Sequence, residues 1–174
     1  GTNQGIYVIY SPYRLFTEGS VYAQEILIPR NDGSGLADPL LGTQVVTAIE
    51  VDGANRKWLG TAAGGVYLVS EDGQEEIEQF NSTNSPLLSN SITDICVDGA
   101  SGEVFFGTDK GIISYRGDAL QGSAQYDQVV VYPNPVRESY EGPLAIKGLV
   151  ESTTVKITDM SGNLVYETES MGGQ

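Results

Sequence analysis

The fold is decided by Thr47-Ala48-Ile49-Glu50-Val51-Asp52-Gly53, a stretch that returns later in the chain as Thr93-Asp94-Ile95-Cys96-Val97-Asp98-Gly99. Successive side chains of such a stretch lie on opposite faces of a strand. The closing Asp-Gly pair is typical of a tight hairpin turn. The two copies are separated by a spacing in the mid-forties of residues, which is typical of the four-stranded blade of a β-propeller. The sequence therefore predicts an all-β fold of repeated sheets.

Two further stretches repeat in the same register. Trp58-Leu59-Gly60-Thr61 corresponds to Phe105-Phe106-Gly107-Thr108, and Gly65-Val66-Tyr67-Leu68 corresponds to Gly111-Ile112-Ile113-Ser114. Residues 1–8 also read like the stretch from Gly60 to Leu68. The first residue is therefore expected at the end of a second blade strand.

The repeat predicts a partial β-propeller of about two and a half blades. The expected strands are Ile6–Tyr10 and Val21–Ile28 in the first blade; Val45–Val51, Lys57–Thr61, Val66–Ser70 and Glu76–Phe80 in the middle blade; and Ser91–Val97, Glu103–Thr108 and Ile112–Tyr115 in the last. No fourth strand is expected in the last blade, because residues 116–123 are polar and rich in glycine. We expect the missing strand to be supplied from outside this sequence, and we expect no closed ring.

Three apolar side chains are predicted to be buried. Trp58 and Phe105 hold equivalent positions, so both are expected to fill the same slot between blades, since a repeated aromatic residue usually belongs to the core of its repeat. Cys96 has apolar neighbours, which favour a buried structural thiol over a nucleophile.

The pattern changes after Gly122-Ser123. Strand-like runs follow at Gln128–Tyr132, Pro143–Ile146, Thr154–Thr158 and Asn163–Thr168. Pro133 and Pro135 are incompatible with the interior of a sheet, so they mark a strand end and a turn. We therefore predict two domains, the C-terminal blades of a propeller over residues 1–122 and an incomplete immunoglobulin-like β-sandwich over residues 123–174.

The repeated part resembles a known propeller repeat. Asp52, Trp58-Leu59-Gly60-Thr61 and Gly64-Gly65-Val66-Tyr67 are similar to the two-component regulator propeller repeat, and the resemblance covers roughly residues 1–117. The second copy departs from that repeat, because it carries Phe105-Phe106 and Lys110-Gly111 at the corresponding places.

The last part resembles a second family. Its similar stretches are Val131-Tyr132-Pro133-Asn134-Pro135-Val136, residues 155–159 and residues 161–165, which look like the C-terminal β-sandwich of type IX secretion proteins in Bacteroidota. A propeller followed by this tail is similar to a surface component of that secretion system. The resemblance implies an extracytoplasmic location, at the outer-membrane surface or in the periplasm, and a role in attaching cargo to the cell surface. It also implies secretion-system or surface proteins as partners, and binding of anionic lipopolysaccharide by the tail.

Composition restricts the function further. The chain has 23 acidic and 9 basic residues, a net charge of −14. Nucleic-acid binding needs a basic face, so no nucleic-acid partner is expected. No apolar run is long enough to span a membrane. The chain has no histidine, which removes the usual general base and the commonest zinc ligand. We therefore predict a non-enzymatic protein without catalytic or cofactor-binding residues.

Two groups of residues are candidates for binding. Asp32 and Asp38 flank a loop and are the calcium candidates, although the bidentate glutamate of a dedicated calcium loop is missing. Tyr13, Phe16 and Tyr22 are expected to pack within the first blade, and the alternative is that they stack on sugars or peptides.

Three functions remain open from the sequence. The first is a protein-interaction scaffold in type IX secretion, and the Pro-Asn-Pro element favours it. The second is the periplasmic ligand-sensing propeller of a hybrid two-component regulator, which would have a membrane helix and a kinase downstream. The third is a polysaccharide-binding or polysaccharide-degrading propeller, which the lack of histidine disfavours as an enzyme.

Overall fold

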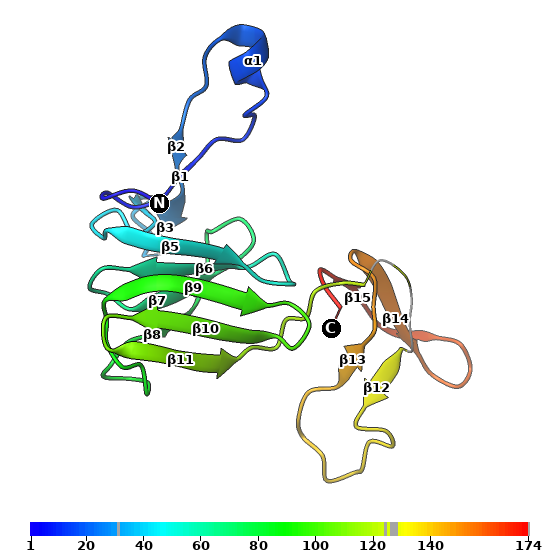
Figure 1. The fold of residues 1–174 in the computed structure, drawn as a ribbon. Coiled ribbons are helices and arrows are strands. Elements are labelled where there is room, and N and C mark those ends of the chain that lie inside the picture. The colour runs from blue at the N-terminus through cyan, green and yellow to red at the C-terminus, as the bar shows by residue number, and fades with distance from the viewer. Residues whose placement is uncertain (31, 124, 126–128, 174) are drawn as a thin grey trace. The chain divides into compact units, whose positions relative to one another are not determined.

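The computed structural model describes residues 1–30, 32–123, 125 and 129–173, and its regular secondary structure is almost entirely β-strand (Figure 1). The strands form several small sheets, and none of those in the described residues closes on itself. The predicted all-β class is therefore confirmed. The helix α1 (Arg14–Glu18) has five residues, and no described helix is long and apolar enough to cross a membrane.

The middle sheet contains four strands in the order β5 (Val46–Val51), β6 (Lys57–Thr61), β7 (Val66–Val69) and β8 (Glu76–Phe80). All four were predicted within a residue of these bounds. β7 is buried along its whole length, and it pairs antiparallel with β6 and β8. Its Val66 lies opposite Phe80, and its Tyr67 lies opposite Gln79.

The next sheet contains three strands in the order β11 (Gly111–Arg116), β10 (Glu103–Thr108) and β9 (Ile92–Asp98). These strands match the prediction. In the part of the chain that the structure describes, no strand pairs with the outer side of β11. β11 therefore corresponds to β7 of the middle sheet. Among the described residues, the three-stranded sheet has no strand that corresponds to β8.

Aromatic rings join the middle sheet to the next one. Trp58 of β6 is fully buried, and its ring centroid lies 5.5 Å from that of Phe106 and 5.8 Å from that of Tyr115. Phe80 of β8 lies 4.9 Å from Tyr115. In these three pairs the rings are tilted against one another, an arrangement that aromatic pairs favour. These four residues are called the ring cluster below, and they hold the two sheets face to face.

The prediction for Phe105 is wrong. Its side chain is 38% exposed, although the equivalent Trp58 is buried. Side chains alternate along a strand, so Phe106 points toward Trp58 and Phe105 points to the opposite face of β10. Cys96 is also exposed, against expectation, while its neighbour Ile95 is buried by the same alternation.

The first predicted blade differs most from the structure. Instead of two long strands, it contains β1 (Tyr7–Val8) paired with β2 (Gln24–Glu25), and a separate hairpin of β3 (Leu27–Pro29) with β4 (Ala37–Pro39). Ile26 interrupts the expected second strand because it packs against the buried cluster that contains Ile6 and Leu40. The helix α1 lies between β1 and β2 and ends at Gly19, whose left-handed backbone (φ 71°) is typical of a helix terminus.

The same turn occurs three times and fixes the register of the repeat. In each copy a threonine hydroxyl donates a hydrogen bond to the carbonyl oxygen of a glycine: Thr2 to Gly5 at 3.0 Å, Thr61 to Gly65 at 2.9 Å and Thr108 to Gly111 at 2.8 Å. The three glycines have φ values of 93°, 86° and 131°, which other residues rarely adopt. The start of the chain thus has the same turn as the two sheets, as the sequence predicts.

Two short hairpins form the last part of the chain. β12 (Val130–Tyr132) pairs with β13 (Ala145–Lys147), and β14 (Thr153–Thr158) pairs with β15 (Leu164–Ser170). β12 ends at Tyr132, the residue before Pro133, so the predicted strand end is confirmed. Gln128 of the expected strand lies outside the described residues. Half-buried and exposed residues alternate along β14, as expected for a strand with one face exposed to solvent.

The chain divides into two compact units. The first contains residues 1–50, 56–96 and 104–115, and the second contains residues 51–55, 97–103 and 116–174. The division at residue 122 between a propeller part and a sandwich part stays a prediction.

Candidate protein-binding surfaces

A groove of 440 Å³ lies between β8 and β11. Most of its lining is apolar, and the side chains used below are Glu78, Phe80, Leu87, Phe106, Ile113 and Tyr115. The Tyr115 hydroxyl donates a long hydrogen bond of 3.5 Å to the Glu78 carboxylate. The groove therefore combines an aromatic wall from the ring cluster with a carboxylate. Its volume is enough for one or two large side chains of a partner.

The position of the groove follows from the repeat. In the middle sheet, Gln79 of β8 lies opposite Tyr67 and donates a hydrogen bond of 2.7 Å to the Tyr67 hydroxyl. The residue equivalent to Tyr67 is Ile113, which lines the groove. The groove thus occupies the place in the three-stranded sheet that β8 fills in the four-stranded one.

Two equivalent glycines show the same difference. A Cβ atom added to Gly65 would overlap the carbonyl oxygen of Phe80, because β8 runs directly beside it. A Cβ atom added to Gly111 would meet only the end of the Leu88 side chain, at 3.3 Å. Among the described residues, there is therefore room for a side chain beside the start of β11. The corresponding space beside β7 is filled by the backbone of β8.

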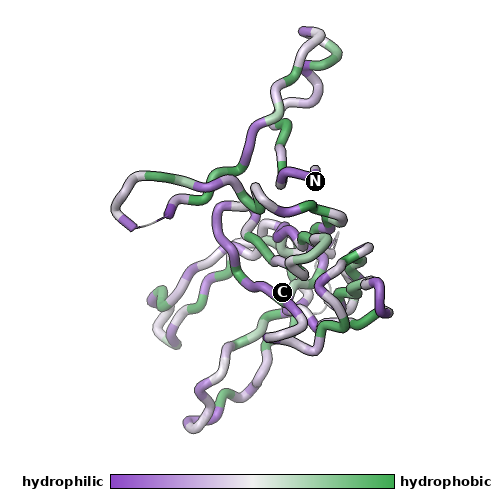
Figure 2. The backbone as a smooth tube through the Cα atoms, turned by 90° about the vertical axis from the view of Figure 1, so that its left-hand side faces the viewer, coloured by the Kyte–Doolittle hydropathy of each residue, from purple (hydrophilic) through white to green (hydrophobic). Residues whose placement is uncertain are grey.

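A second candidate surface is the aromatic arm, which we define as residues 9–22 between β1 and β2 (Figure 1). Phe16 is 89% exposed and Tyr22 is 82% exposed, and Tyr10 and Tyr13 are also exposed. The prediction that Tyr13, Phe16 and Tyr22 pack within a blade is wrong, because they lie on the short helix and its flanking loops rather than on a paired strand. Apolar and polar stretches alternate along this part of the backbone (Figure 2). Exposed aromatic groups of this density are typical of interaction surfaces.

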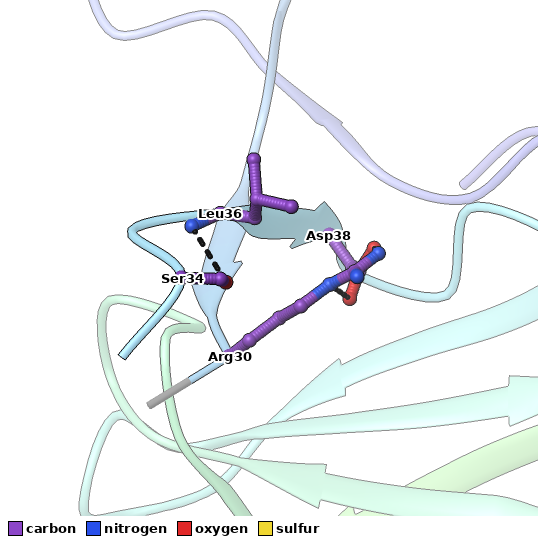
Figure 3. Close-up of polar contacts among 4 residues, drawn as sticks. All are labelled: Arg30, Ser34, Leu36 and Asp38. Atoms are coloured by element: carbon purple, nitrogen blue, oxygen red, sulfur yellow. Dashed lines mark hydrogen bonds and ion pairs between the residues drawn. The ribbon is translucent and has the colours of Figure 1, made fainter. Parts of the chain in front are cut away.

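The two calcium candidates have different surroundings. Arg30 donates two hydrogen bonds to the Asp38 carboxylate, at 2.7 and 2.6 Å (Figure 3). These bonds hold the pKa of the Asp38 carboxyl below its ordinary value. Asp32 instead accepts a hydrogen bond from the Ser34 amide at 2.9 Å. No group of three potential metal ligands occurs among the described residues, and calcium binding at Asp32 and Asp38 stays a prediction.

Many of the aspartates stabilise turns. In each case the carboxylate accepts a hydrogen bond from the amide two residues further on, at 2.8 to 3.1 Å: Asp32 from Ser34, Asp52 from Ala54, Asp72 from Gln74, Asp98 from Ala100 and Asp159 from Ser161. Aspartate favours turns for this reason. The hydrogen bonds from Ser70 and Gln74 lower the pKa of Asp72, which stays ionised at neutral pH. These carboxylates therefore stabilise the turns in which they lie.

The chain was compared with family profiles, curated protein sequences and solved structures. No family profile and no curated protein sequence matches the chain. A solved structure does match: PorZ, described as an essential bacterial surface component of the type IX secretion system of Porphyromonas gingivalis. The likeness covers 99% of this chain, with 35% sequence identity and a TM-score of 0.65. This chain is similar to PorZ.

The likeness has a defined extent. The chain spans 23% of the PorZ chain that it matches, so it corresponds to about a quarter of that protein. Over this part, the all-β fold is similar to that of PorZ. The resemblance to type IX secretion proteins, which the Pro-Asn-Pro element suggested from sequence, agrees with this result at the level of the secretion system.

Proposed function

We propose that this protein is a non-enzymatic interaction scaffold of a type IX secretion system, located outside the cytoplasm. The observation that carries the proposal is the likeness to PorZ over 99% of the chain at 35% identity. In this proposal, residues 1–122 are propeller blades and residues 123–174 are the first part of a tail sandwich. The partners are secretion-system or surface proteins, and the protein helps to attach cargo to the cell surface.

The surfaces of the chain support a protein-binding role. The aromatic arm and the groove beside β11 both expose aromatic and aliphatic groups, which are enriched at protein interfaces. The only charged residue between Ile6 and Thr17 is Arg14, which forms an ion pair with Glu18 at 3.0 Å. Interfaces are depleted of charge at their centre, so this stretch has the composition of a contact surface.

Lipopolysaccharide binding by the tail is also part of the proposal. A chain with 23 acidic and 9 basic residues repels an anionic lipid surface at long range. Any such binding must therefore use local contacts of the tail. A metal-bridged contact would be one way to overcome the repulsion, since divalent cations bind carboxylates and phosphates together.

Affinity purification tests the scaffold role. The tagged protein is expressed in its own Bacteroidota host, and proteins recovered from the outer membrane are identified by mass spectrometry. We expect secretion-system components to be enriched, and a variant with Phe16→Ser and Tyr22→Ser to recover them less well, because both side chains are exposed and available to a partner. A matched variant with Asn163→Ser in the turn of the last hairpin serves as the control. Recovery of no secretion component would contradict the proposal.

A further inference from the structure

The turn that follows β8 contains the sequence Asn81-Ser82-Thr83. An asparagine that is followed two places later by serine or threonine, with any residue except proline between them, is the acceptor sequence for N-linked glycosylation. This sequence occurs once in the 174 residues of the chain. In the structure it lies outside the strands, with Ser82 and Thr83 exposed and Asn81 half-buried. The acceptor sequence therefore lies at the surface, where a modifying enzyme has access to it.

The side-chain oxygen of Asn81 holds this turn together. It accepts hydrogen bonds from the backbone amides of Thr83 and Asn84, at 2.9 and 3.1 Å, and a further one from the Thr83 hydroxyl. The backbone amide of Asn81 donates a hydrogen bond of 2.8 Å to the side-chain oxygen of Asn84. The asparagine and the hydroxyl of the acceptor sequence are thus in contact in the folded protein.

The side-chain nitrogen of Asn81 is not used by the turn. Nδ2 can donate two hydrogen bonds, and it has no acceptor among the described residues. Five other turns make the same bond to the amide two residues further on with an aspartate, as Asp72 does with Gln74 at 3.0 Å. Aspartate has no side-chain nitrogen, so a turn of this kind does not require an amide side chain. The fold therefore leaves the nitrogen of Asn81 without a structural role.

The hydrogen bonds of the turn also favour a reaction at this nitrogen. An amide nitrogen is a poor nucleophile because its lone pair is shared with the carbonyl group. Loss of a proton from the nitrogen places negative charge on the carbonyl oxygen, and hydrogen bonds to that oxygen stabilise the charged form. The Thr83 hydroxyl and two backbone amides supply such bonds to Asn81. A general base of an enzyme then needs to remove one proton from Nδ2.

We propose that Asn81 is an N-glycosylation site, modified outside the cytoplasm by a transferase that uses a lipid-linked sugar diphosphate. Nδ2 forms a bond to the anomeric carbon of the sugar, the bond from that carbon to the diphosphate oxygen breaks, and the diphosphate leaves with the electron pair. The proton from Nδ2 goes to the base of the transferase, and nothing is oxidised or reduced. This inference goes beyond the scaffold role, and it rests on the proposed function only for the location of the protein.

Mass spectrometry of the full-length protein tests the inference, after expression in its own Bacteroidota host and purification from the cell envelope. The proteolytic peptide that contains residues 81–83 is fragmented by electron transfer, which keeps sugars attached and locates them on one residue. We expect the mass of an oligosaccharide on Asn81. An unmodified peptide, or a sugar on Ser82 or Thr83 instead, would overturn the inference and leave the scaffold role to its own test. Protein confined to the cytoplasm would overturn both the inference and the proposed location.

Four variants separate the acceptor sequence from the turn, and circular dichroism shows whether each is folded. Asn81→Asp keeps the oxygen that the turn uses, and Thr83→Val keeps the size of the side chain, but we expect both to lose the sugar. Thr83→Ser keeps the hydroxyl and is expected to keep the sugar. Ser85→Ala is the matched control, because the Ser85 hydroxyl donates a hydrogen bond of 2.7 Å to the backbone carbonyl of Asn81 without belonging to the acceptor sequence. A sugar that persists in Thr83→Val, or that is lost in Ser85→Ala, would contradict the inference.

Discussion

Replacing Trp58 with alanine is expected to lower the free energy of unfolding by about 3–5 kcal/mol, the usual cost of removing a large buried aromatic side chain. Trp58 is fully buried and contacts rings from both sheets, including Phe106 and Tyr115 of the neighbouring sheet. Its loss removes apolar burial and leaves a cavity where the two sheets meet. Urea unfolding followed by far-ultraviolet circular dichroism measures the effect.

The matched control is Phe105→Ala at the equivalent place in the next strand repeat. Phe105 is 38% exposed and lies on the face of β10 that points away from Trp58. We expect a loss of about 1 kcal/mol or less, as for substitutions outside a packed core. Equal losses for the two variants would show that both rings are in equivalent surroundings and that the face-to-face packing described above is incorrect.

Replacing Gly65 with alanine is expected to cost roughly 2–5 kcal/mol. About 1–2 kcal/mol comes from forcing a residue with a Cβ atom into a backbone with φ near 86°. About 1–3 kcal/mol comes from the overlap of the new Cβ with the Phe80 carbonyl oxygen, since crowding of a packed site costs this much. The carbonyl of Gly65 also accepts the hydrogen bond from the buried Thr61 hydroxyl, so movement of the backbone disturbs the turn.

Gly33→Ala is the control for this variant. Gly33 has a similar φ of 79°, but a Cβ atom there would meet nothing within 4 Å. The control therefore measures the backbone cost alone, and we expect a loss of about 1–2 kcal/mol. Thermal or urea unfolding of both variants gives the comparison. A loss for Gly65→Ala that does not exceed the loss for Gly33→Ala would mean that β8 does not run beside Gly65.

The two central sheets were predictable because their sequence pattern occurs twice in the chain. The copies that begin at Thr47 and Thr93 share apolar alternation and turn residues, so each supports the other, and the predicted strands agree with β5 to β11. The first blade follows the repeated pattern only over residues 1–8. Its second long strand, Val21–Ile28, was expected from apolar residues that the structure uses differently: Ile26 packs into the core between β2 and β3, and Tyr22 is exposed in the aromatic arm.

The errors at single residues have one physical origin. A repeat shows that Trp58 and Phe105 are equivalent within their sheets, but it does not show whether another sheet covers the outward face. Burial depends on that neighbour, and Phe105 and Cys96 lie on a face that is not covered in the described residues. The groove beside β11 has the same origin. The absence of a fourth strand was predicted from the polar stretch that begins at residue 116. The volume of the groove, and its lining by Phe80 and Tyr115, could be seen only in the structure.

The contact between the two sheets is the central claim, and nuclear Overhauser effects from the indole protons of Trp58 test it most directly. The chain contains a single tryptophan, so these signals are assigned without ambiguity. We expect cross-peaks to the ring protons of Phe106 and Tyr115, whose centroids lie 5.5 and 5.8 Å away. An indole with cross-peaks only to residues of its own sheet, such as Phe80, would contradict the account.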